Sequence, residues 1–117
     1  MNKEYLQFEK LETWKKAREL VSGLFDITRG LSDRDFNSQI RRAALSIMNN
    51  IAEGHESGSP RSFIRYLKIA KGSCGEVRSM LYAGFDVKYI SQIRFQENHE
   101  RTLDIYRMIS GLIKSLK

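Results

Sequence analysis

This sequence of 117 residues contains one cysteine, one proline and no long apolar run. A single cysteine, Cys74, cannot form a disulfide within the chain, which excludes a disulfide-stabilised domain and favours a reducing compartment. No apolar stretch approaches the roughly 20 residues of a membrane-spanning helix. The first ten residues also lack the apolar core of a signal peptide. We therefore expect a cytoplasmic protein without a membrane partner.

Groups able to do chemistry are also scarce. The only histidines are His55 and His99, and the sequence has no His-x-x-x-His or Cys-x-x-Cys pair, whereas metal sites usually need three or four such ligands. Cys74 and His99 fall at apolar helical positions, where a buried thiol and a core-edge histidine bonded to a neighbour are the simpler interpretations. We predict no catalytic residue, no metal and no cofactor, and hence no enzyme.

The composition and periodicity instead favour helices. A chain of this length can form one core without a metal or disulfide. Apolar residues recur every three or four positions over residues 11–29, 36–54, 60–84 and 92–116. No segment shows the two-residue alternation of a strand. The sequence therefore predicts a single all-α domain, an antiparallel up-down-up-down four-helix bundle.

Several residues are typical of helix ends. Ser32 or Asp33 is a candidate cap for the second helix, and Gly54 is predicted to lie just past its end. Ser59 is predicted to cap the third helix, and Pro60 suits its first position, where a missing N–H costs nothing. These residues mark where the predicted helices end and the connectors between them begin.

The third and fourth predicted helices each carry one regular apolar seam. The seams are Phe63, Leu67, Ala70, Cys74, Val77 and Leu81, and Phe95, His99, Thr102, Tyr106, Ile109, Ile113 and Leu116. Gly72 and Gly75 lie inside the third helix, where each costs about 1 kcal/mol relative to alanine. We predict that they let a neighbouring backbone approach closely.

The second predicted helix carries two apolar stripes. The first consists of Phe36, Ile40, Ala44, Ile47 and Ile51, and the second of Leu45, Met48 and Ala52, preceded by Arg41. A helix that is apolar on two sides needs two partners. One is its own core and the other is another helix or subunit. We predict an oligomer interface formed by Leu45, Met48, Asn50 and Glu53.

The charge balance favours a polyanionic partner. The formal net charge is +6 and the sequence pI is about 9.6. On the third helix, an arc away from the apolar seam holds Arg61, Arg65, Lys68, Lys71 and Arg78. This arc is either a solvated face or a surface that follows phosphates. The sequence has no helix-turn-helix and no aromatic RNA-stacking motif, so binding would depend on backbone charge and shape.

Arg41 and Arg42 form a second candidate site for nucleic acid. Arginine suits bidentate contacts with phosphate or carboxylate. Arg41 lies beside the second apolar stripe, so in an oligomer it would reach a subunit boundary. There it would either contact RNA or form a salt bridge between subunits, to Glu53 or Glu76. Both interpretations remain open at this point.

Four motifs extend over nearly the whole chain. They are Phe8-x-x-Leu11-x-x-Trp14-x-x-Ala17, Ser38-Gln39-Ile40-Arg41-Arg42-Ala43-Ala44-x-Ser46-Ile47, Asn50-Ile51-Ala52-Glu53-Gly54, and Phe63-x-x-Tyr66-Leu67-x-Ile69-Ala70-x-Gly72-Ser73 followed by Glu76. Together they resemble the bacterial four-helix-bundle proteins encoded in intervening sequences of 23S rRNA genes, once described as ribosomal proteins. Family members often have proline in the second helix where this chain has Met48, which favours a straighter helix here.

The resemblance implies an antiparallel bundle that assembles as a ring-like homopentamer. The family is similar to the accessory variability protein of diversity-generating retroelements, a basic pentamer that works with a reverse transcriptase and nucleic acid. The partners that it implies are therefore further copies of the chain, RNA or DNA, and a reverse transcriptase or another protein.

These observations lead to one expected function and two alternatives. We expect a non-enzymatic, basic homo-oligomer that binds structured RNA or DNA mainly through phosphates. The first alternative is an oligomeric scaffold that binds a protein partner without nucleic acid. A weaker alternative is an enzyme whose site lies at a subunit boundary near Arg41, Glu53 and His55.

Overall fold

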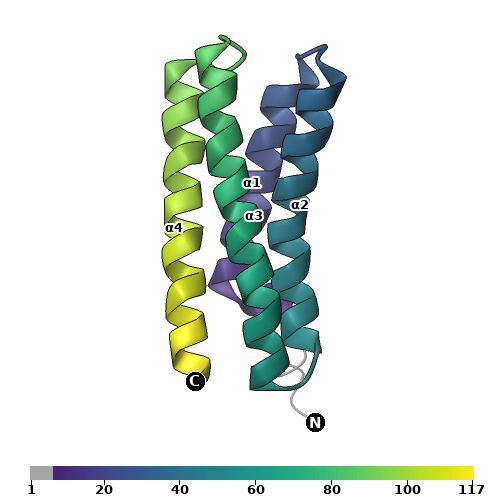
Figure 1. The fold of residues 1–117 in the computed structure, drawn as a ribbon, viewed down its shortest axis with the longest axis vertical. Helices are drawn as coiled ribbons and strands as arrows, with labels where there is room; N and C mark the ends of the chain where they lie inside the picture. The colour runs from purple at the N-terminus through teal and green to yellow at the C-terminus, as the bar shows by residue number, and fades with distance from the viewer. Residues whose placement is uncertain (1–6) are drawn as a thin grey trace.

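The computed structural model describes residues 7–117, which form four long helices (Figure 1). After a short 3-10 helix, η2 (Phe8–Lys10), the helices are α1 (Glu12–Arg29), α2 (Arg34–Glu56), α3 (Pro60–Asp86) and α4 (Gln92–Leu116). No strand occurs in this range. The predicted all-α four-helix bundle is therefore confirmed.

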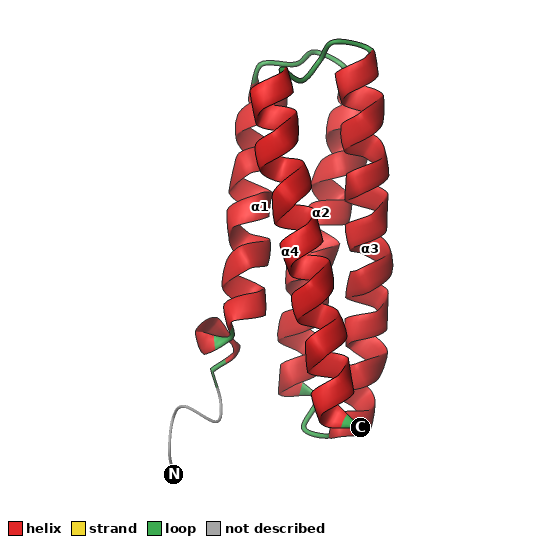
Figure 2. Cartoon of the chain, turned by 90° about the vertical axis from the view of Figure 1, so that its left-hand side faces the viewer, coloured by secondary structure: helices red, strands yellow, loops and turns green. Residues whose placement is uncertain are grey.

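The four helices run antiparallel in an up-down-up-down order. The α1–α2 and α3–α4 connectors lie at one end of the bundle, and the α2–α3 connector and the C-terminus lie at the other (Figures 1 and 2). Each helix packs against the next in sequence, and α1 also packs against α4. The last contact closes the bundle around one core.

Side chains cap the N-termini of α2, α3 and α4. The Asp33 carboxylate accepts a hydrogen bond from the Phe36 N–H at 3.0 Å, which caps α2. The Ser59 hydroxyl accepts one from the Ser62 N–H at 3.1 Å, and Pro60 is the first residue of α3. Each cap satisfies a backbone donor that the helix cannot. Of the two candidate caps of α2, Asp33 is the one that forms, and the predicted start of α3 is confirmed.

The prediction that Gly54 lies past the end of α2 is wrong. The helix begins at Arg34 and continues through Gly54 and His55 to Glu56. Gly54 is buried, and a Cβ built on it would lie 2.8 Å from both Phe63 Cδ1 and Tyr66 Cβ. Its function is to allow close packing of α2 against α3. The sequence of α2 alone does not indicate this contact, because it depends on the residues of α3 that lie opposite.

The prediction for Gly72 and Gly75 is also wrong. A Cβ at either position would meet no atom within 4 Å among the described residues. Both glycines lie on a face of α3 that is turned away from the core, so no neighbouring backbone approaches them. Close approach occurs instead at Gly84, where a Cβ would meet Ile90 and Phe36 side chains at 2.7 and 2.8 Å. The helix α3 continues past Gly84 to Asp86, so this glycine lies inside the helix and not at the predicted end.

The apolar seam of α3 is confirmed, and that of α4 is partly wrong. All six predicted seam residues of α3 are buried. On α4 the buried residues are Asn98, Thr102, Ile105, Ile109 and Ile113. The predicted stripe included Tyr106, which is 38% exposed, and missed Ile105. Steps of three and four residues can be drawn through either of two adjacent positions on a helix. At this turn the buried position is Ile105 and not its neighbour Tyr106.

The two stripes of α2 have different environments. The first stripe is buried, apart from half-buried Phe36. In the second stripe, Met48 and Ala52 are half-buried and pack against the core of their own chain. Leu45 is half-buried but lies outside that core cluster. The apolar surface left for another partner is therefore narrower than the sequence predicted.

Candidate nucleic-acid and assembly surfaces

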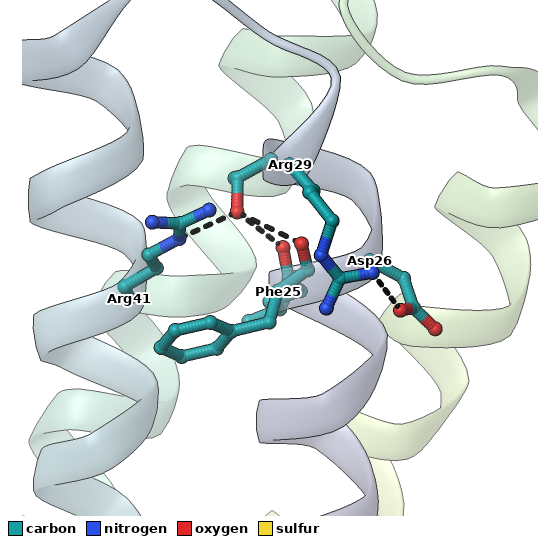
Figure 3. Close-up of polar contacts among 6 residues, drawn as sticks. Phe25, Asp26, Arg29 and Arg41 are labelled. Carbon is teal, nitrogen blue, oxygen red and sulfur yellow. Dashed lines mark hydrogen bonds and ion pairs between the residues drawn. The ribbon is translucent and has the colours of Figure 1, made fainter.

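The side chain of Arg41 on α2 contacts two residues of α1 in the same chain. Its Nε donates a hydrogen bond of 2.7 Å to the Thr28 hydroxyl, and its guanidinium lies 4.6 Å from the centre of the Phe25 ring (Figure 3). Thr28 in turn donates to the Leu24 carbonyl at 2.7 Å. A cation over an aromatic face is attracted by the ring quadrupole. Arg41 thus joins α2 to α1.

Arg41 forms no ion pair with another residue of the described chain. Among residues 7–117, the ion pairs are Lys15–Glu12, Lys16–Glu19, Arg29–Asp26 and Arg107–Asp104, all three residues apart on one helix. Glu53 and Glu76 are exposed. A salt bridge from Arg41 to a carboxylate of another subunit remains a prediction.

A groove lies along α2 and is bordered by Phe25 of α1, and we call it the α1–α2 groove. It has a volume of about 840 Å³, and its lining includes Phe25, Arg41, Leu45, Asn50 and Glu53. Arg42 also lines it, with its Nη2 donating to the Ser38 hydroxyl at 3.3 Å. The fold therefore brings both predicted arginines and three of the four predicted interface residues to one surface.

Polar groups in this groove are partly satisfied by the chain itself. The Asn50 amide donates to the Ser46 carbonyl at 2.8 Å and to the Ser46 hydroxyl at 3.1 Å. The Ser46 and Ser73 hydroxyls lie 2.8 Å apart, which extends the network to α3. Asn37 donates to the Leu31 carbonyl at 2.8 Å, while its buried Oδ1 has no hydrogen-bond partner in residues 7–117. Asn50 thus has a structural function within the chain.

The predicted basic arc on α3 divides into two parts. Arg61, Arg65 and Lys68 are exposed, and we call them the α3 cation face. Lys71 and Arg78 are half-buried and lie 4.8 and 5.7 Å from the centre of the Tyr106 ring on α4. None of the five forms an ion pair in the described part of the chain.

The sequence reasoning missed an aromatic cluster across α3 and α4. Tyr82 lies 5.1 Å from Phe95 and 5.4 Å from His99 between ring centres, and Phe85 lies 5.0 Å from Phe95. The Tyr82 hydroxyl and His99 Nε2 are 3.2 Å apart. We call these four residues the α3–α4 aromatic cluster. The available signal was that Tyr82 and Phe85 are aromatic but lie off the apolar seam of α3.

The single thiol is buried and unreactive in this environment. The Cys74 Sγ donates to the Thr102 carbonyl at 3.2 Å, and burial raises the pKa of the thiol to about 11. At neutral pH the group is therefore protonated, and the thiolate is the nucleophilic form. The prediction of a buried cysteine is confirmed, as is that of a core-edge His99 bonded to a neighbour.

Within residues 7–117, no group of three or more His, Cys, Asp or Glu side chains is placed to hold a metal ion. None of the four described helices combines the length and apolarity needed to cross a membrane.

The fold and these surfaces define a basic, all-α four-helix bundle with exposed cations on one helix. The model of the family described as 23S rRNA-intervening sequence protein matches residues 9–111, and the chain belongs to this family. A similar solved structure is a protein with unknown function from the S23 ribosomal protein family of Bacteroides thetaiotaomicron. It is 23% identical, with a TM-score of 0.80 over 87% of this chain and 95% of that chain, which supports the fold. The comparison with curated proteins gave no match.

Proposed function

We propose that this protein is a non-enzymatic, basic oligomer that binds structured RNA or DNA through phosphate contacts. The observation that carries the proposal is the α3 cation face, where Arg61, Arg65 and Lys68 are exposed and lack an acidic partner in the described chain. Cations without an intramolecular partner can neutralise phosphates and release counterions. The net charge of +6 acts in the same direction at longer range.

A non-enzymatic function agrees with the state of the candidate reactive groups. The Cys74 thiol is protonated and buried, and His99 is engaged with Tyr82 and stacked on Phe95. The weaker alternative placed an enzyme site near Arg41, Glu53 and His55. Arg41 is occupied by Thr28 and Phe25, which disfavours that site.

Self-assembly is the second part of the proposal. Leu45 lies in the α1–α2 groove beside Arg41, Asn50 and Glu53 and outside the core of its own chain. A half-buried leucine among polar groups is suited to the margin of an interface between copies. We propose a homo-oligomer, and the family resemblance makes a homopentamer its expected form.

The proposal is tested by reversing the charge of the α3 cation face. The triple variant Arg61→Glu, Arg65→Glu, Lys68→Glu should bind a duplex RNA at least about tenfold more weakly, because three phosphate contacts are lost. Fluorescence anisotropy with a labelled duplex measures the affinity. Unchanged affinity would remove this face as the binding site.

A matched control separates a local from a global charge effect. Lys15→Glu, Arg29→Glu and Arg107→Glu change the net charge by the same amount, but these three cations pair with acids on their own helices. The control variant should lose less affinity than the test variant. Equal losses would show that only net charge matters. Circular dichroism of both variants checks that the bundle is folded.

The scaffold alternative has its own supporting observation. The α1–α2 groove has a volume of about 840 Å³ and both apolar and charged lining residues, as a protein-binding groove does. Oligomers that fail to bind any RNA or DNA at low salt would favour this alternative, in which the partner is a protein.

A further inference from the structure

Two aromatic side chains of the α3–α4 aromatic cluster are open to solvent. Tyr82 is 51% exposed and Phe85 is 38% exposed, whereas Phe95 and His99 behind them are half-buried. Edge-to-face packing of Tyr82 on both Phe95 and His99 fixes the orientation of its ring. The cluster lies toward the end of the bundle that carries the α3–α4 connector (Figure 1). Phe95 packs against the core, whereas Tyr82 and Phe85 lie outside the core cluster and present their rings to solvent.

Cations lie along the same α3–α4 seam. Lys71 and Arg78 both lie over the ring of Tyr106, so the α4 tyrosine holds the two charges at the seam. Arg78 and Tyr82 are one helical turn apart on α3, which places them on the same side of the helix. The seam therefore presents cations followed by rings in a single line along the bundle.

Two residues without a side chain lie between Lys71 and Arg78 on α3. Gly72 and Gly75 lie in this interval, and no described atom would contact a Cβ at either of them. Each glycine costs helix stability of about 1 kcal/mol relative to alanine. Among residues 7–117, no packing contact to a Cβ at either position compensates that cost. The missing side chains at these two positions leave room beside the cations for a ligand.

We infer that the α3–α4 seam binds single-stranded segments of nucleic acid, with unpaired bases stacked on Tyr82 and Phe85 and phosphates near Lys71 and Arg78. The inference rests on the proposed function and specifies the class of nucleic acid. Bases stack on exposed rings whatever their sequence, because every base has a π-face, and cations in the same groove follow the backbone. A peptide partner would not require rings and unpaired cations in one line.

The inference changes one expectation from the sequence. The sequence has no recognisable RNA-stacking motif, so it predicts binding through backbone charge and shape. The fold brings Tyr82 and Phe85 of α3 beside Phe95 and His99 of α4. No single segment of the sequence predicts this contact, because it depends on how the two helices pack. Stacking would add a preference for unpaired bases that the α3 cation face cannot provide.

Three fluorescently labelled probes of equal length test the inference by anisotropy at one salt concentration. They are a single-stranded oligonucleotide, a strand of the same backbone without bases, and a duplex. The single strand should bind at least about fivefold more tightly than the abasic strand, since stacking on one ring already contributes that factor. The double variant Tyr82→Leu, Phe85→Leu should lose this difference and keep its affinity for the duplex.

Two control variants separate stacking from structural damage. Tyr82→Phe keeps the ring, loses the hydroxyl contact with His99, and should retain the preference for the strand with bases. Ile69→Ala removes another exposed apolar side chain, which is 49% exposed, and should leave all three affinities unchanged. Circular dichroism checks the fold of each variant.

The possible failures are distinct. Equal binding of the single strand and the abasic strand would overturn the inference and leave the proposed function intact. A preference that survives in the double variant would show that these rings are not the stacking surface and would overturn it too. Failure of all three probes to bind would overturn the proposed function, and the inference with it.

Discussion

The missing side chain at Gly54 determines how closely α2 and α3 pack. A Cβ at this position would lie 2.8 Å from Tyr66 Cβ, an atom close to the backbone that cannot rotate away. It would also lie 2.8 Å from the ring of Phe63. The helices would have to separate to accept even an alanine. This contact explains why a helix-breaking residue occurs inside α2.

We predict that Gly54→Ala destabilises the bundle although alanine favours helix. Overpacking costs about 1–3 kcal/mol, which exceeds the gain of about 1 kcal/mol in helix propensity. Urea denaturation followed by circular dichroism measures the free energy of unfolding. Gly72→Ala is the control, because a Cβ there meets nothing within 4 Å of the described chain, and it should stabilise the protein. A more stable Gly54→Ala variant would contradict the packing at this position.

The glycines also show what can be read from the sequence at this scale. Caps such as Asp33 and Ser59 depend on neighbours three residues away, so the sequence predicts them. The functions of Gly54 and Gly72 depend on which helix lies opposite each residue. A single sequence contains no signal for that contact.

At the scale of the helices, Asp33 connects two linkers at the same end of the bundle. Its carboxylate accepts from the Phe36 N–H and, at 2.8 Å, from the hydroxyl of Tyr89 in the α3–α4 connector. These two hydrogen bonds lower the pKa of Asp33. The hydrogen bond between Tyr89 and Asp33 also raises the pKa of Tyr89. Tyr89 also packs edge-to-face on Phe36 at 5.3 Å.

The lowered pKa of Asp33 predicts a pH-dependent stability. A carboxyl group with a lowered pKa in the folded state stabilises the fold above its unfolded pKa, near 3.8, and loses that effect as the pH falls through its folded value. Asp33→Ala should therefore lower the melting temperature at neutral pH. The difference from the parent protein should shrink as the pH falls below 3.8. A difference that is constant over this range would contradict the hydrogen-bonded carboxylate.

Helix seams show a similar limit of sequence reasoning. All six residues predicted for the α3 seam are buried, because they repeat at regular steps of four and three along the helix. On α4, Tyr106 occupies a position next to the core and interacts with Lys71 and Arg78 instead. An amphipathic tyrosine fits either side of such a boundary, so the pattern alone places the seam one position away.

At the scale of the whole molecule, a substitution at Leu45 tests whether the protein assembles through the α1–α2 groove. Leu45→Asp introduces a charge in the α1–α2 groove, whereas Met48 packs on the core and would confuse assembly with folding. We predict that Leu45→Asp gives a smaller particle by light scattering while circular dichroism shows a similar helix content. An unchanged mass would show that the groove is not an interface.

The candidate surfaces were predicted less well than the fold. The arc of five cations on α3 follows from helical geometry, and Arg61, Arg65 and Lys68 are exposed as the geometry requires. Lys71 and Arg78 interact with Tyr106, and Arg41 interacts with Phe25 and Thr28. These cations turn toward rings on other helices, and such contacts depend on tertiary packing.

The salt dependence of duplex RNA binding tests the central proposal most directly. Each phosphate contact contributes about 0.9 to the slope of log affinity against log salt concentration. The parent protein should therefore show a steep slope, and the Arg61→Glu, Arg65→Glu, Lys68→Glu variant a slope that is shallower by roughly two to three. Equal slopes for the two proteins, or an affinity that does not depend on salt, would contradict phosphate binding by the α3 cation face.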